Sequence, residues 1–337
     1  MKNILPFLLL LIFIFGCESP TEKKDTVLNE DSHYPRWMQS DSIHSDQTSG
    51  ITFIKSTNQK KIFLIADDIG KIYHFTIEND TVFNFEPVNF SPYVVAYLDT
   101  FPKADFEEIV YDKYTGNVYL SIEGNNPDPK KFVGIYKLNF ENDNVLSNYL
   151  MSMEKLKITP SDLFTKYVAN NIGYEGLAVD ENHFYLGLEG FSEQNIFADS
   201  TLLFIVDKNN LEIKKTISTK SLGIGTICGL YSDKNNSIYG IDRNSKKLFH
   251  IEIDNSLNVI SSYTKNLKSS IPGYPKYDYV AALESITSDD NNNFYLVDDP
   301  WKTYYIPSQD ILSHLDPKTI NNFKEFIPVI YKYSFQN

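Results

Sequence analysis

Cysteine is nearly absent from this sequence. Only Cys17 and Cys228 occur among its 337 residues. Two cysteines can form one disulfide at most, and a lipid on Cys17 would prevent even that one. We therefore expect a hydrophobic core to hold the fold together, which a body of roughly 300 residues can supply.

Local catalytic motifs are missing as well. There is no Gly-x-Ser-x-Gly elbow, no His-Glu-x-x-His and no phosphate-binding loop. The six histidines are scattered without the spacing of metal ligands. The acidic run at residues 289–293 lacks the spaced glycine and the distal glutamate of an EF-hand, so it is interpreted as a hairpin turn.

Basic residues are in the minority. The chain has 31 Lys and Arg against 44 Asp and Glu, a formal net charge of −13. Such an acidic balance argues against nucleic acid and anionic lipid as partners.

One long apolar run is present, at residues 4–16, directly after Met1-Lys2. A basic start and a short apolar run are typical of a secretory signal. The residues Ile14-Phe15-Gly16-Cys17 resemble a bacterial lipoprotein box. That resemblance implies cleavage before Cys17 and acylation of its thiol, which would anchor the protein to a membrane of the bacterial cell envelope, facing outside the cytoplasm. The alternative is an ordinary signal peptide with a chance cysteine.

Three segments follow from this interpretation: a lipoprotein signal peptide at 1–16, a flexible polar tether at 17–33, and one folded domain at 34–337.

A short pattern recurs through the folded part and is clearest at residues 171–190. Gly-Tyr-Glu-Gly-Leu opens an apolar run, a polar turn follows, and Phe184-Tyr185-Leu186 leads to Glu189. Two short apolar runs around a turn predict a β-hairpin. The equivalent apolar positions recur every 53 to 68 residues and are Ile51, Ile109, Leu177, Leu230 and Ile286. Strand repeats of this size are typical of propeller blades. We predict an all-β, five-bladed β-propeller; six blades, or a β-sandwich with similar hairpins, are the alternatives.

The last repeat shows only three strands, the third at residues 329–335. A propeller closes its ring when one terminus completes the last blade. We therefore expect the N-terminal residues 36–43 to supply the missing strand. Two short helices are also predicted, one at 161–168 capped by Ser161 and one after Asp316-Pro317.

Acidic residues mark both ends of the repeated hairpin. The start of one strand lies beside the end of the next in an antiparallel hairpin, so radial repetition would gather these carboxylates at one mouth of the central channel. Crowded carboxylates repel one another unless a cation balances them, and oxygen ligands suit Ca²⁺. The candidate calcium ligands are Glu107, Glu123, Glu175, Glu189, Glu284, Asp299 and Asp67. The alternative is that these side chains only accept hydrogen bonds from backbone donors.

Three more residues are candidates for a ligand pocket at the same mouth. Arg243 follows Asp242 in the fourth repeat and could neutralise part of the carboxylate ring. Trp301 and Tyr304 lie in the long excursion after Asp299. Packing of that excursion against the blade is the alternative for the two aromatic residues.

Two stretches resemble known propeller families. Residues 171–178, Asn-Ile-Gly-Tyr-Glu-Gly-Leu-Ala, resemble a signature of the phytase-like propellers with esterase-like activity. Asp105-Phe-Glu-Glu-Ile, with Tyr119-Leu-Ser-Ile-Glu, resembles the SdiA-regulated family. The likeness spans residues 45–335 and implies a five-bladed envelope domain with calcium near the repeated glutamates. Cys228 departs from the pattern in the fourth repeat.

Three classes of function remain open. The first is a calcium-stabilised envelope module, without enzymatic activity, that binds a small molecule or a protein. The second is a metal-dependent hydrolase of phosphoesters or lactones, in which the cation would polarise the substrate and activate water. The third is a structural envelope protein without a ligand. The fold alone does not decide among them; the lack of a His or Lys base beside the glutamates disfavours the second.

Overall fold

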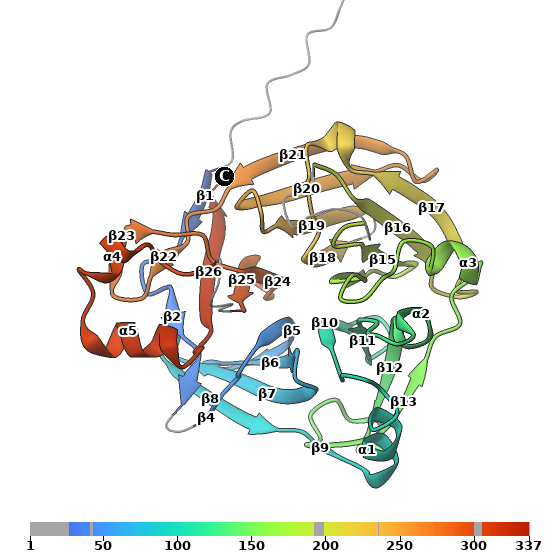
Figure 1. The fold of residues 1–337 in the computed structure, drawn as a ribbon, viewed down its shortest axis with the longest axis horizontal. Coiled ribbons are helices and arrows are strands. Elements are labelled where there is room, and N and C mark those ends of the chain that lie inside the picture. The colour runs from blue at the N-terminus through green and yellow to red at the C-terminus, as the bar shows by residue number, and fades with distance from the viewer. Residues whose placement is uncertain (1–26, 41–42, 192–198, 235, 300–304, 337) are drawn as a thin grey trace, which may run out of the picture.

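The computed structural model describes residues 27–40, 43–191, 199–234, 236–299 and 305–336. They form five sheets around a central axis, which confirms the predicted five-bladed β-propeller (Figure 1). The first blade comprises β5 (Thr48–Thr57), β6 (Lys60–Asp67), β7 (Lys71–Glu78) and β8 (Val82–Pro87), and the second comprises β10 (Phe106–Asp112), β11 (Asn117–Ile122), β12 (Gly134–Phe140) and β13 (Tyr149–Lys155), with β9 (Asn89–Phe90) at its edge. The third comprises β14 (Gly176–Val179), β15 (His183–Gly187), β16 (Leu202–Asp207) and β17 (Ile213–Ser218), and the fourth comprises β18 (Gly229–Lys234), β19 (Ser237–Asp242), β20 (Lys247–Ile253) and β21 (Val259–Asn266). The fifth comprises β24 (Leu283–Ser288), β25 (Asn293–Asp298) and β26 (Val329–Gln336), with β1 (Val27–Glu30) and β2 (Arg36–Trp37) paired to β26.

Two small ribbons and short helices lie outside the blades. They are β3 (Gln39–Ser40) with β4 (Ile43–His44), β22 (Ser270–Ile271) with β23 (Tyr274–Asp278), α1 (Pro92–Leu98), α2 (Pro129–Phe132), α3 (Ser161–Phe164), α4 (Gln309–Leu312), α5 (Pro317–Lys324) and the 3₁₀ turns Glu141–Asp143 and Lys220–Leu222. None of the helices in the described residues is long and apolar enough to cross a membrane.

The innermost strand of each blade surrounds the central channel. These strands are β5, β10, β14, β18 and β24; each contacts the next, and β24 contacts β5, so the ring is closed. The five apolar positions of the sequence repeat all lie on them and are all buried. Gly229 shows how close the strands come, because a Cβ there would lie 2.7 Å from the Cα of Ser285. The channel wall is therefore backbone packed against backbone.

Aromatic side chains fill the spaces between neighbouring blades. Tyr119 of the second blade meets Phe184 of the third edge-to-face, with ring centroids 4.8 Å apart. Phe63 of the first blade meets Tyr295 of the fifth in the same way at 5.1 Å. Such pairs add to the free energy gained by burying the rings, and they fix each blade against its neighbours.

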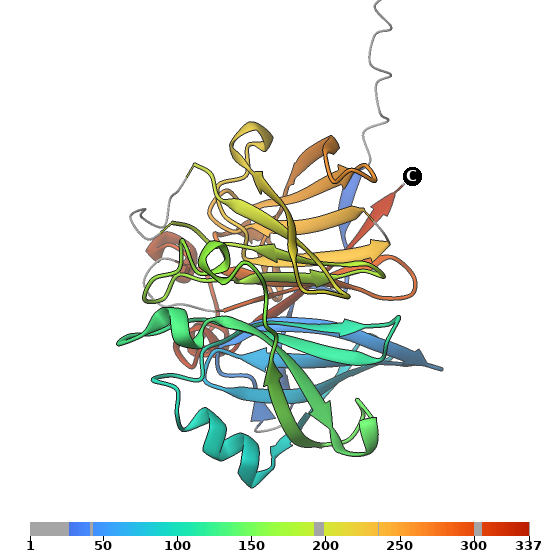
Figure 2. The ribbon, with the colours of Figure 1, turned by 90° about the vertical axis from the view of Figure 1, so that its right-hand side faces the viewer.

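The N-terminal part of the described chain completes the fifth blade, but mainly through a segment other than the predicted one. Among the described residues of the range 36–43, β2 alone pairs with β26, at Val329 and Ile330. β1 pairs with the second half of β26, from Tyr333 to Gln336. Figure 2 shows β1 in blue beside the C-terminal strand. β26 has eight residues, and the two residues of β2 can pair with only a small part of its edge. β1 pairs with four further residues of that edge.

β1, at Val27–Glu30, therefore lies inside the range 17–33 that was predicted to be a tether. The predicted helix after Asp316 is confirmed: the Asp316 carboxylate accepts hydrogen bonds from the backbone N–H groups of Lys318 and Thr319. The cap predicted at Ser161 is wrong. Pro160 occupies the capping position without a side-chain hydrogen bond, and α3 ends at Phe164.

Candidate metal and ligand site at the channel mouth

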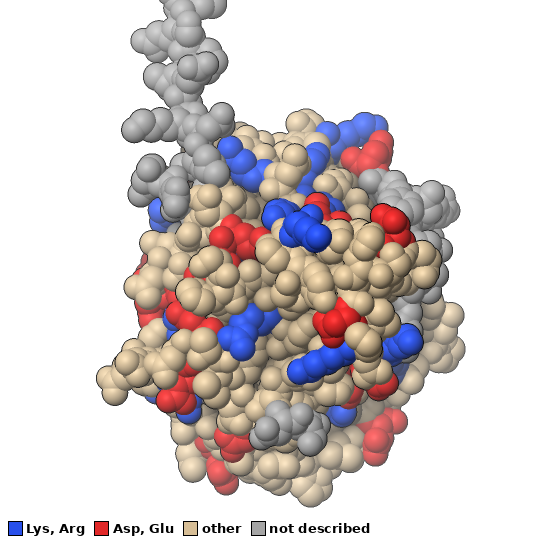
Figure 3. All heavy atoms as spheres, turned by 90° about the vertical axis from the view of Figure 1, so that its left-hand side faces the viewer, with Lys and Arg blue, Asp and Glu red and all other residues tan. Residues whose placement is uncertain are grey.

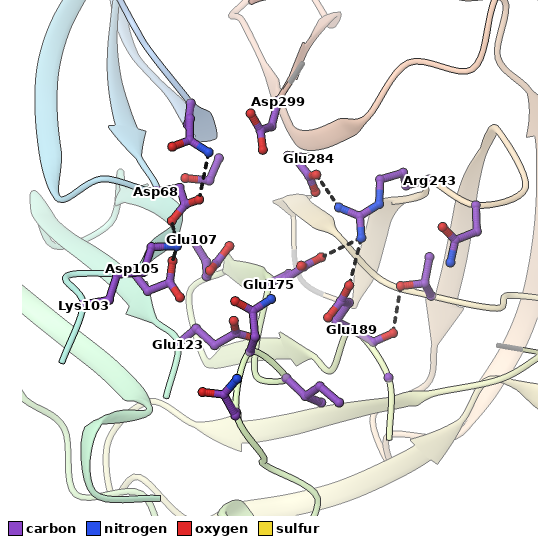
Figure 4. A pocket seen from close by; sticks show the side chains of 18 of the residues that line it. Asp68, Lys103, Asp105, Glu107, Glu123, Glu175, Glu189, Arg243, Glu284 and Asp299 are labelled. Atoms are coloured by element: carbon purple, nitrogen blue, oxygen red, sulfur yellow. Dashed lines mark hydrogen bonds and ion pairs between the residues drawn. The ribbon is translucent and has the colours of Figure 1, made fainter. Parts of the chain in front are cut away.

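A cavity of about 500 Å³ opens at one end of the central channel. Eight carboxylates and two cationic side chains line it, together with polar and aromatic residues. The charged residues are Asp68, Asp105, Glu107, Glu123, Glu175, Glu189, Glu284, Asp299, Lys103 and Arg243 (Figure 4). Six of the seven predicted ligands are therefore gathered at one place, and Arg243 is there with them.

One backbone contact, repeated in three blades, explains this gathering. The N–H of Glu123 donates to the carbonyl of Asp105, two residues before Glu107. The N–H of Glu189 donates in the same way to Gly173, two residues before Glu175, and that of Asp299 donates to Ala282, two residues before Glu284. The first strand of each hairpin therefore starts where the second ends, as predicted.

Asp67 does not lie in the cavity. In the first blade the equivalent contact runs from the N–H of Asp68 to the carbonyl of Gln47, so Asp68 takes the position predicted for Asp67. The Asp67 carboxylate is buried and accepts hydrogen bonds from the Ser45 hydroxyl and the Asp46 N–H. Side chains alternate along a strand, so a shift of one residue turns the carboxylate to the other side.

Asp68, Lys103 and Asp105 are site residues that the sequence prediction missed. Lys103 pairs with Asp68, and its Nζ lies 2.5 Å from Oδ1 of Asp105. Of these three residues, the sequence pointed only to Asp105, because it lies two residues before Glu107 in the repeated motif. Trp301, Tyr304 and Cys17 lie outside the described residues. Tyr305, next to Tyr304, does line the cavity.

Arg243 offsets part of the negative charge on one side of the cavity. It pairs with Glu284, and its Nη2 lies 2.8 Å from Oε1 of Glu189 and 3.9 Å from Oε2 of Glu175. The Tyr305 ring lies against the guanidinium, 5.5 Å from its Cζ. In this part of the cavity one guanidinium therefore pairs with three carboxylates.

Glu107, Glu123 and Asp299 have no such partner. Within the described residues, no Lys, Arg or His forms an ion pair with them. Glu123 is only 2% exposed, and its Oε1 accepts no hydrogen bond. Donor oxygens of Asp105, Glu107 and Glu123 lie within 4.8 Å of one another. A buried, unpaired acceptor in such a cluster is costly unless a cation or proton meets it.

The carboxyl groups respond by holding protons more tightly. Burial raises the pKa of Glu107, Glu123 and Glu175 well above the ordinary value. Neighbouring carboxylates raise these pKa values further. Glu123 has this effect on Glu107, and Glu189 has it on both Glu123 and Glu175. Burial, followed by the nearby Asp105, raises the pKa of Asp68 to about 7. A divalent cation would reverse these shifts by favouring the charged forms.

Gly173, in the clearest copy of the repeat, leaves the room that Glu123 occupies. A Cβ at this position would lie 3.0 Å from Cγ and 3.2 Å from Oε1 of Glu123. A side chain at this position would therefore press on Glu123 and force its carboxylate to shift. The acidic cavity also contrasts with the outer face in Figure 3, where acidic and basic side chains are scattered without a continuous patch of either sign.

Comparison with known proteins gives a likeness of fold. No family model matches the chain, and no curated protein matches it. Among solved structures, a GH43_1 enzyme from Xanthomonas citri complexed with xylose has 8% identity, covers 89% of each chain and has a TM-score of 0.49. The PQQ-bound aldose sugar dehydrogenase from Streptomyces coelicolor has 8% identity, covers 92% of this chain and 98% of its own, and has a TM-score of 0.48. A gluconolactonase from Xanthomonas campestris has 8% identity, covers 93% and 90%, and has a TM-score of 0.44. No residue role transfers at these identities.

Proposed function

We propose that this chain is a calcium-binding β-propeller of the bacterial cell envelope, with the ion held by Asp105, Glu107 and Glu123. The observation that carries the proposal is the convergence of their oxygens within 4.8 Å, with the buried Oε1 of Glu123 left without a partner. Carboxylate oxygens are the donors that Ca²⁺ prefers.

The surroundings fit the same ion. Asn170 and Asn171 line the cavity beside the cluster, and amide carbonyl oxygens are also calcium ligands. Asn125 donates to Oδ2 of Asp105 at 2.6 Å, which orients that carboxylate. A bound Ca²⁺ would balance the charge of Glu107 and Glu123 and hold the start of β10 to the end of β11, because all three carboxylates come from the second blade.

We further propose that the cavity serves a binding module anchored through a lipid on Cys17 and facing outside the cytoplasm. Its volume, about 500 Å³, lies in the range of small-molecule sites. Ile172, Phe191 and Tyr305 give it an apolar part. The resemblance of residues 105–109 and 171–178 to the SdiA-regulated and phytase-like families supports the calcium proposal.

A metal-dependent hydrolase is the second candidate. The observation in its favour is the raised pKa of Glu107 and Glu175, since perturbed carboxyl groups in a cavity suit acid–base catalysis. The hydroxyls of Ser49 and Thr226 donate to the backbone carbonyls of Phe106 and Glu189. Neither is therefore placed as a nucleophile, and the attacking group would have to be water activated by the ion.

Calorimetry and melting curves with Ca²⁺ test the proposal. The parent should bind Ca²⁺ and melt at a higher temperature in its presence, by an amount that corresponds to about 2.7 kcal/mol at a hundredfold excess over Kd. Glu123→Gln should remove most of this response. Asp67→Asn is the matched control, because it deletes a buried carboxylate outside the cavity and should leave calcium binding unchanged. A parent that shows neither heat nor shift would refute the calcium site.

The same samples separate binding from catalysis. A panel of phosphoesters and lactones, assayed with calcium and with a chelator, should show no turnover for a binding module. Turnover that depends on the metal and disappears in Glu123→Gln would establish the hydrolase instead.

A further inference from the structure

Among the described residues, two groups of potential metal ligands lie in or directly beside the cavity. The first is the proposed calcium site. The second comprises Glu175, Cys228 and Glu284, whose donor atoms also lie within 4.8 Å of one another. Cys228 is 1% exposed, and its thiol contacts Thr226 Oγ1 at 3.7 Å. The second group therefore adds a soft sulfur donor to two carboxylates.

The two groups differ in what balances their charge. Figure 4 shows the guanidinium of Arg243 directed at Glu175, Glu189 and Glu284, with ion pairs to all three. In the other group, Lys103 pairs with Asp105 and with the neighbouring Asp68, and within the described residues no cationic side chain forms an ion pair with Glu107 or Glu123. Each half of the cavity thus has one cationic side chain, but Lys103 leaves Glu107 and Glu123 without an ion pair, whereas Arg243 pairs with every carboxylate of its half.

Arg243 is held firmly in this place. It directly follows β19, whose last residue, Asp242, accepts hydrogen bonds from the N–H groups of Gly225 and Ser245 at 2.8 and 3.0 Å. Tyr305 packs against the guanidinium and is oriented by its hydroxyl, which donates to Asn244. Arg243 is 8% exposed, and its Nε has no hydrogen-bond partner. A guanidinium cannot lose its proton in a protein, so the charge is permanent.

We propose that Arg243 occupies the place of a second metal ion: it pairs with the carboxylates of its half, excludes divalent cations there, and masks a second site formed by Glu175, Cys228 and Glu284. This inference builds on the proposed function, because it explains why the cavity would hold one divalent ion rather than two. It also predicts the class of metal that the masked site would take. Two carboxylates with a thiolate suit a softer ion such as Zn²⁺ or Cd²⁺, whose binding would release the thiol proton.

Cadmium is the probe that distinguishes the two halves, because it binds carboxylates and forms a thiolate bond with an ultraviolet charge-transfer band. The parent should bind one Cd²⁺ per chain without that band. Arg243→Gln should bind two, with the band present. Arg243→Gln combined with Cys228→Ser should lose the band. Arg243→Lys keeps the positive charge and should behave like the parent.

The outcomes separate this inference from the calcium proposal. If the parent already shows the band or binds two ions, Arg243 does not mask a site and the inference is wrong. If folded Arg243→Gln binds one ion without the band, the inference is also wrong while the calcium site stands. If the parent binds no ion and Arg243→Gln binds one with the band, the calcium site is wrong and the role of Arg243 stands. Should Arg243→Gln not fold, Arg243→Met provides an apolar replacement, and the parent titration remains decisive.

Discussion

Oε1 of Glu108 lies 2.5 Å from the hydroxyl oxygen of Ser285 and joins the innermost strands of the second and fifth blades inside the channel. The same hydroxyl accepts a hydrogen bond from the N–H of Ile51 in the first blade. Three blades therefore meet at one buried carboxyl group. Oε2 of Glu108 has no partner, and burial raises the pKa of Glu108 well above its ordinary value.

We expect Glu108→Gln to be at least as stable as the parent at pH 8, because the amide keeps the acceptor for Ser285 without a buried charge. Glu108→Ala should lose about 1–3 kcal/mol, since it leaves buried donors unpaired. Urea denaturation of the three proteins measures both effects. A glutamine variant less stable than the alanine variant would contradict this view of the channel.

Gly173→Ala should weaken calcium binding about tenfold, or about 1.4 kcal/mol, because the new Cβ would displace the Glu123 carboxylate. Gly134→Ala is the control: its Cβ would meet only the flexible side chain of Lys155, outside the cavity. Calorimetric titration of both variants with Ca²⁺ is the measurement. Equal affinities would show that Glu123 is not a ligand.

A chain that starts at residue 32 should be less stable than one that starts at residue 26. The longer chain retains β1, the hydrogen bond from Ser270 to Glu30 and the packing of Leu28. Burial of an apolar side chain such as Leu28 contributes about 1–3 kcal/mol, and loss of β1 also exposes the edge of β26. Identical melting temperatures would show that β1 does not close the ring.

Stability without divalent cations should fall as the pH rises from about 4 to about 7. Burial raises the pKa of Asp67 and Asp298 to about 7, so the folded chain binds protons more tightly than the unfolded chain. The contribution of each group is complete below the unfolded pKa and disappears as the pH passes the folded value. Denaturation midpoints between pH 4 and pH 8 measure the slope, and Asp67→Asn should make it shallower. A midpoint that rises with pH would contradict these shifts.

Cys17→Ser should release the protein from the membrane fraction and remove the mass of the lipid. The residues before Cys17 resemble a lipoprotein box, and acyl chains provide the anchoring. Cys228→Ser, which changes a buried cysteine of the fourth blade, is the control and should remain membrane-bound. Unchanged fractionation and mass of Cys17→Ser would refute the anchor.

The sequence by itself determined the repeat and therefore the fold. Ile51, Ile109 and Leu177 mark innermost strands because alternating burial and turn chemistry are local properties, visible in short windows. The same periodicity predicted that Glu107 lies near Glu123, and Glu175 near Glu189, because the start of the first strand in an antiparallel hairpin lies beside the end of the second.

Tertiary structure decided which side of a strand each carboxylate faces and what balances it. Asp67 and Asp68 are adjacent in sequence, yet only Asp68 lines the cavity, because the register of β5 and β6 turns Asp67 toward Ser45. The closing strand β1 escaped prediction because its four residues are too few to show a strand pattern, and the segment forms a strand by pairing with β26. The ion pairs of Arg243 join residues 41 to 68 positions away in the chain. Spacing along a sequence cannot specify such contacts; they form only when the blades close into a ring and bring separate strand ends to one mouth.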